Sequence, residues 1–105
     1  MQMAISEADW KVYKRIRDLA WERYAQRVLD EVADICRDDT EPATERFARL
    51  APLVRERDKA SYHLFDTLRR SSAVRCLIAM RSYALVTDDE MQGFSPELQQ
   101  RTTLA

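Results

Sequence analysis

The sequence predicts an all-α fold: an antiparallel helical bundle of two long helices, with a third helical segment and short C-terminal helices. One Gly and three Pro among 105 residues leave little material for the turns of a sheet, whereas residues that favour helices are abundant. Apolar residues also recur at the three-four spacing of amphipathic helices. A chain of this length forms one domain, which we assign to residues 1–105.

The two long helices are predicted to form an antiparallel hairpin. Ser6, followed three residues later by Asp9, indicates the start of a first helix over residues 7–36. A second helix begins near Pro42, and Pro52 is expected to kink it or to split off its first turns. The apolar stripe of the second helix is Phe47, Leu50, Val54, Ser61, Leu64, Phe65 and Leu68.

The third helical segment is predicted over residues 73–85. No Gly or Pro separates it from the second helix, so the two could form one continuous helix. Residues 87–90 read Thr-Asp-Asp-Glu, a capping box, and Gly93 is a candidate stop. Ser95 and Pro96 indicate the start of a last short helix, and the polar tail after Leu98 is expected to fray.

The segment Leu77 to Phe94 resembles a known family. Its sequence around residues 84–91, Ala-Leu-Val-Thr-Asp-Asp-Glu-Met, is similar to the short C-terminal helical pairs called SHOCT domains, in which Gly usually stands at the position of Ala84. The resemblance implies an interaction module. The whole chain also resembles short uncharacterised helical proteins of proteobacteria, which implies no activity.

The apolar face of the first helix changes direction along its length. Between residues 10 and 20 the apolar side chains share one side, formed by Val12, Tyr13, Ile16, Leu19 and Ala20. From residue 24 onward the apolar set is centred roughly 150° away at about 100° per residue. It comprises Ala25, Val28, Leu29, Val32, Ile35 and Cys36. Coiled-coil drift of about 20° per heptad is too small to absorb this change.

This shift has three interpretations. The helix is kinked near residues 20–24, or its second face packs on a second copy of the chain, or the third segment and the C-terminal helices cover that face within the monomer. Because a two-fold pairing would cover the second apolar face of each copy with the same surface of the other, we expect a homodimer. Its candidate interface residues are Trp10, Tyr13, Trp21 and Tyr24. An unidentified protein is the other candidate partner.

The middle of the second helix carries five consecutive charges, residues 55–59, beside the aromatic residues of the first. A charge within the apolar stripe needs a partner, and Arg57 could stack on Trp21. The simpler interpretation is a solvated charged face. The alternative is a polar pocket that includes Arg57, Asp58 and Tyr62.

The second and third helical segments are locally basic. Arg69 and Arg70 precede two serines and could bind phosphate, which gives a nucleic-acid-binding accessory protein as the alternative function. A net charge of −1 argues against it, and the hairpin brings Glu7 and Asp9 towards these arginines. Acidic residues crowd the end of the first helix, where Arg46 and Arg49 are candidates to compensate them.

No catalytic, cofactor or metal site is predicted. His63 is the single histidine, with Asp66 three residues on, and no paired Glu-x-x-His motif or glycine-rich loop accompanies it. Cys36 and Cys76 have no metal or redox spacing and are interpreted as core residues too far apart for a disulfide. Without an apolar run of about 20 residues or a secretory signal, we expect a cytoplasmic, non-catalytic interaction or regulatory module.

Overall fold

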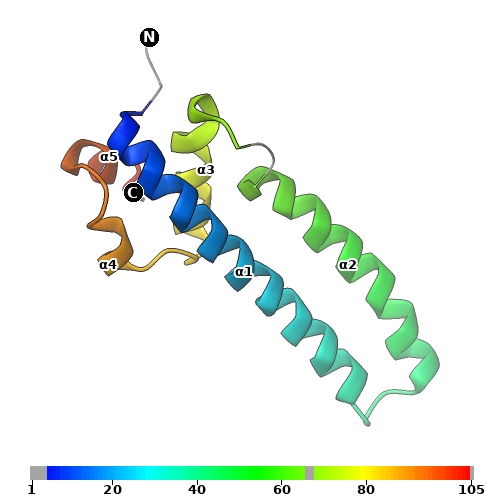
Figure 1. Ribbon diagram of the computed structural model, residues 1–105. Helices are drawn as coiled ribbons and strands as arrows, with labels where there is room; N and C mark the ends of the chain where they lie inside the picture. Colours follow the sequence, from blue (N-terminus) through cyan, green and yellow to red (C-terminus); the bar gives the residue numbers. More distant parts are fainter. Residues whose placement is uncertain (1–4, 66–67, 105) are drawn as a thin grey trace.

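The computed structural model describes residues 5–65 and 68–104, and these form an all-α fold, as predicted. Two long helices, α1 (Glu7–Arg37) and α2 (Ala43–Phe65), are followed by α3 (Arg70–Ser82) and two short helices, α4 (Asp88–Met91) and α5 (Pro96–Arg101). Figure 1 shows α1 and α2 side by side, with α3, α4 and α5 gathered at one end of this hairpin. The molecule is therefore elongated, measuring 53 × 25 × 25 Å.

The turn between α1 and α2 is closed by an arginine of α2. Arg46 donates to the backbone carbonyls of Cys36, at 2.6 Å, and Glu41, at 3.1 Å. A cation at the carboxyl end of a helix opposes the negative pole of its dipole, so Arg46 compensates α1 as expected. Arg49 instead pairs with Glu41, in the turn itself.

The structure decides two points about α2 that the sequence left open. It continues through Pro52, so its first turns are not split off. Pro52 lacks the amide that would donate to the Ala48 carbonyl. Because Ala48 is exposed, water can satisfy this carbonyl instead. At its other end α2 stops at Phe65, before α3 begins at Arg70. Leu68 therefore lies outside both helices, and the two are not continuous.

The buried core occupies only one end of the hairpin, which we call the head: α1 up to Tyr24, α2 from Ser61, and α3 to α5. Its largest fully buried side chains are Tyr13, Leu64, Leu77, Met80, Leu85, Thr102 and Cys76. Burial beside the Cys76 thiol raises the pKa of the Tyr13 phenol. Hydrophobic burial therefore stabilises the head and leaves the other end of the hairpin to local helix formation.

The C-terminal helices are held to the head by polar side chains. The Asp9 carboxylate accepts from the Ser95 amide at 2.8 Å and from its hydroxyl at 2.6 Å, joining the start of α1 to the N-cap of α5. Arg81 donates to the Thr102 hydroxyl at 2.9 Å. Thr102 is completely buried, so the prediction of fraying after Leu98 is wrong at this position.

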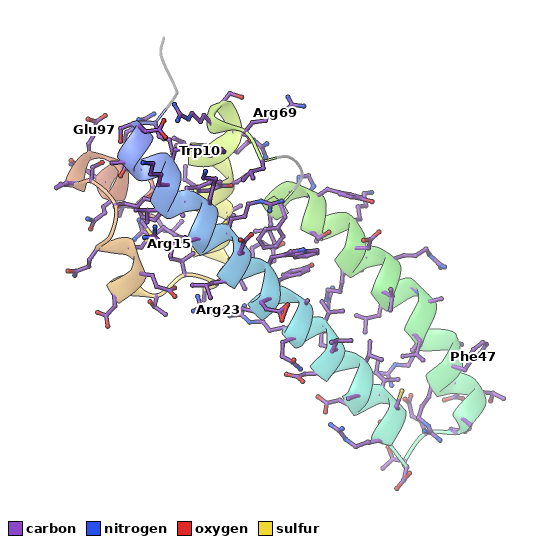
Figure 2. All side chains as sticks on the ribbon, viewed as in Figure 1. Trp10, Arg15, Arg23, Phe47, Arg69 and Glu97 are labelled. Carbon is purple, nitrogen blue, oxygen red and sulfur yellow. The ribbon has the colours of Figure 1, made fainter. Side chains whose placement is uncertain are left out.

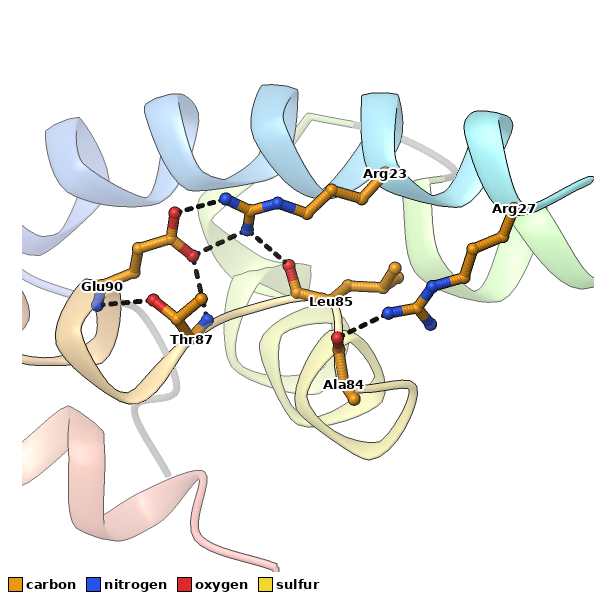
Figure 3. Close-up of polar contacts among 6 residues, drawn as sticks. All are labelled: Arg23, Arg27, Ala84, Leu85, Thr87 and Glu90. Atoms are coloured by element: carbon orange, nitrogen blue, oxygen red, sulfur yellow. Dashed lines mark hydrogen bonds and ion pairs between the residues drawn. The ribbon is translucent and has the colours of Figure 1, made fainter. Parts of the chain in front are cut away.

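Two arginines of α1 donate hydrogen bonds to the loop after α3 (Figure 3). Arg23 makes a bidentate pair with Glu90, with both N–O distances 2.7 Å, and donates to the Leu85 carbonyl at 2.8 Å. Arg27 donates to the carbonyls of Tyr83 and Ala84, at 2.5 and 2.7 Å. The carboxylate of Glu90 also closes the predicted capping box by accepting from the Thr87 amide at 2.9 Å.

Helix α3 ends in a left-handed turn at Ala84. The Leu85 amide donates to the Met80 carbonyl and the Ala84 amide to the Arg81 carbonyl, both at 2.9 Å, which is the Schellman pattern. Ala84 has a φ of +55°. Glycine adopts this conformation without steric cost, whereas a Cβ costs roughly 1–2 kcal/mol.

Replacing Ala84 with Gly should raise the free energy of unfolding by about 1 kcal/mol, because it relieves the left-handed strain. Chemical denaturation followed by circular dichroism measures the change. Ala33→Gly, in regular α1, is the control and should lower stability by about 0.5–1 kcal/mol. Equal losses in the two variants would contradict the assignment.

The Arg23–Glu90 pair should make the head sensitive to acid. Hydrogen bonds from Arg23, and then from Thr87, lower the pKa of Glu90 to about 2 from 4.5. A depressed carboxyl pKa stabilises the fold above about pH 4.5, and this stabilisation is lost as the pH falls towards 2. Glu90→Gln should cost about 1.5–3 kcal/mol at pH 7 and flatten the dependence between pH 5 and 2.

Glu97→Gln is the control for this charge removal. Glu97 pairs only loosely with Arg101, at 3.7 Å, and its side chain is exposed. Its substitution should leave both the stability at pH 7 and the acid transition nearly unchanged. Denaturation curves collected at several pH values distinguish the variants, and an unaltered pH slope in Glu90→Gln would refute the role of the pair.

Candidate functional site

The hairpin beyond the head forms a projecting arm, residues 25–60, that has no buried core of its own. All of these residues are described by the structure, and none of their side chains is buried. The cause is a difference in length: α1 spans 31 residues, about 46 Å, whereas α3 spans 13, about 20 Å. Helix α3 ends beside Tyr24, where Tyr83 meets the Tyr24 ring edge-on. Val28 packs against the edge of the core and Arg27 reaches the loop after α3, but further along the arm its two helices pack against each other.

The second apolar face of α1 is therefore only partly covered. Val28, Val32 and Ile35 are half-buried, whereas Leu29 and Cys36 are exposed. The interpretation in which the third segment and the C-terminal helices cover this face is wrong for most of it, because Val28 at its start packs against the core whereas Leu29 and Cys36 are exposed. Helix α1 itself is continuous from Glu7 to Arg37.

A groove opens between α1 and α2 where the arm joins the head. Its cavity of about 260 Å³ is lined mainly by apolar side chains, from Trp21, Ala25, Val28 and Leu29 on α1 and Val54 on α2, with Asp58 also in the lining. Trp21, which is 42% exposed, rests on Phe65 with a ring-centroid separation of 4.6 Å. The head thus provides an aromatic wall at one end of an otherwise open groove.

Of the predicted pocket residues, the structure brings Arg57 and Asp58 together at this groove. Arg57 does not stack on Trp21 but pairs with Glu31 on α1, through two 2.9 Å hydrogen bonds, and with Glu56 at 2.7 Å. These carboxylates raise the pKa of the Arg57 guanidinium, and Arg57 lowers that of Glu31. Tyr62 is exposed and is not part of the lining.

Two hydroxyls beside the groove already have hydrogen-bond partners within the chain, whereas the Asp58 carboxylate lies on its exposed rim. The Tyr24 hydroxyl donates to the Arg57 backbone carbonyl at 2.7 Å, and the Ser61 hydroxyl donates to that of Asp58 at 2.5 Å. A group that fills the groove would therefore not need to supply hydrogen bonds to these two hydroxyls, which favours an apolar occupant.

The four predicted interface aromatics occupy different environments. Tyr13 and Tyr24 are buried in the head. Trp10 is half-buried and stacks on Tyr13, with Lys14 and Arg70 over its ring at 5.7 and 5.6 Å. Trp21 is the member of the set that presents a large exposed surface, and it does so at the groove.

The predicted phosphate-binding arginines are not a free pair. Arg70 forms an ion pair with Glu7, as the hairpin arrangement led us to expect. Arg69 is exposed at the N-cap of α3, and Asp9 lies with Ser95 instead. Figure 2 shows Arg69 and Trp10 at the head end of the molecule, far from Phe47.

The candidate chemical groups are dispersed. His63 is exposed on α2, while Asp66 lies outside the described residues. Both cysteines are free thiols; Cys76 is buried as expected, but Cys36 is exposed and is not a core residue. Within residues 5–65 and 68–104, no group of three or more His, Cys, Asp or Glu side chains could hold a metal ion. None of the described helices is both long enough and apolar enough to cross a membrane.

Sequence patterns did not identify the exposed apolar residues of the arm. Leu29 is 60% exposed, Phe47 79% and Val54 47%. Phe47 and Val54 follow the three-four spacing of a core stripe, so the pattern alone assigned them to the interior. The signal that could have identified them was the short third segment, which cannot reach the far end of the hairpin.

Comparison with protein-family models, with curated proteins and with solved structures finds no match for this chain.

Proposed function

We propose that this chain is a non-catalytic protein-interaction module that forms a homodimer through the apolar face of the arm. The observation that carries the proposal is a 36-residue arm without a buried side chain that nevertheless presents Leu29, Phe47 and Val54 to solvent. Apolar residues grouped on one face of a monomer are typical of interaction sites. A second copy would provide the packing layer that α3 is too short to supply.

The size of this face fits a small dimer. The 13 residues of α1 and 18 of α2 in the arm, at ~1.5 Å per residue and a width of ~10 Å per helix, give a face of roughly 500 Å². Two copies would bury about 1,000 Å² in total, near the lower limit for a specific interface. We therefore expect a dimer that dissociates on dilution.

Two further parts of the proposal rest on local geometry. The segment Leu77 to Phe94 is proposed to be a SHOCT-like helical pair; the left-handed Ala84, where those modules usually have Gly, and the capping box at Thr87 support it. A cytoplasmic location is proposed on the exposed free thiol of Cys36, which suits a reducing compartment.

Light scattering coupled to size exclusion, over a wide concentration range, tests self-association. The wild-type chain should show a dimer mass at high concentration, and Leu29→Gln should raise the dissociation constant tenfold or more, since each copy loses an apolar contact. Leu19→Gln is the matched control, because Leu19 is also exposed on α1, at 45%, but lies in the head. A wild-type chain that is monomeric at every concentration would refute the proposal.

A further inference from the structure

We propose that two copies pair with their arms antiparallel, so that the Phe47 ring of each copy fills the groove of the other. This inference rests on the proposed self-association and adds its orientation and its central contact. It follows from where the arm places its most exposed aromatic side chain, its groove and its charges.

Phe47 and the groove lie on the same side of the hairpin but at opposite ends of the arm. Phe47 precedes Val54 by seven residues, so the helical repeat places both on the same face of α2, about 10 Å apart along its axis. Val54 lines the groove, whereas Phe47 lies near the tip and is 79% exposed (Figure 2). A ring at the tip is too far from the groove to fill it within one chain.

The groove suits a phenyl ring. A dry cavity of ~150 Å³ accommodates benzene, and the groove offers about 260 Å³ with an open side. Its wall carries the exposed part of Trp21, which gives an incoming ring an aromatic partner. The neighbouring polar atoms of Tyr24 and Ser61 keep their hydrogen bonds to α2 carbonyls when the groove is filled.

Only an antiparallel pairing brings the ring and the groove together. A two-fold axis across the middle of the arm exchanges its ends, so each tip lies over the other copy's groove. A parallel pairing would place groove against groove and Phe47 beside Phe47, leaving both cavities unfilled. Because a filled cavity gains contacts that an empty one lacks, shape favours the antiparallel arrangement.

Charge favours the same arrangement. Asp38 and Asp39 lie in the turn between α1 and α2, at the tip of the arm. A parallel pairing would place two such acidic turns side by side, whereas the antiparallel pairing separates them.

Disulfide trapping in the full-length chain tests the orientation. In a Cys36→Ser background, with Cys76 left buried, the double variant Phe47→Cys/Val54→Cys should form a covalent dimer under mild oxidation, because the antiparallel pairing places α2 over α2. Residues 47 and 54 are about 10 Å apart along α2, beyond disulfide reach within a chain. The single variant Phe47→Cys is the matched control and should remain non-covalent, because the antiparallel arrangement separates the two tips.

The dimer dissociation constant tests the contact itself. Phe47→Ala should raise this constant tenfold or more, whereas Leu19→Ala should leave it within twofold of wild type. Efficient cross-linking of the single Phe47→Cys variant, or equal effects of the two alanine variants in a chain that still dimerises, would overturn this inference and leave the proposed function intact. A wild-type chain that stays monomeric would overturn both.

Discussion

The shortness of α3 is the constraint on which the rest of the structure depends. Its 13 residues cover α1 only as far as Tyr24, and the hydrophobic core ends at that level. Stability from apolar burial is consequently concentrated in the head. The arm keeps helical geometry through its continuity with the head and through pairs such as Arg57 with Glu31, which link its two helices without burying them.

The end of α3 is fixed by polar groups rather than by a glycine. Arg23 and Arg27 of α1 donate hydrogen bonds to the carbonyls of the turn after α3. Glu90 holds Arg23 in place and also caps α4. These contacts hold Ala84 in a conformation that it would otherwise avoid. The same hydrogen bonds hold α4 against α1, at the level where the arm begins to be exposed.

The arm lacks the helices that would cover its apolar face. A two-helix hairpin cannot enclose an apolar layer, and a third and fourth helix from a second copy would make a four-helix bundle. The exposed Phe47 at the tip and the apolar groove at the base of the arm are the features that support the proposed self-association.

The sequence by itself determined the helices, the hairpin and most helix ends, since helix propensity, apolar spacing and caps such as Ser6, Thr87 and Ser95 act within a few residues of the chain. It also located the change of apolar face in α1, and it offered a pocket that includes Arg57 and Asp58 as the alternative to a solvated charged face. Only the tertiary structure decided which apolar residues are buried. Tyr24 and Leu29 both belong to apolar faces of α1, yet only Tyr24 is covered, because burial depends on how far a distant helix reaches.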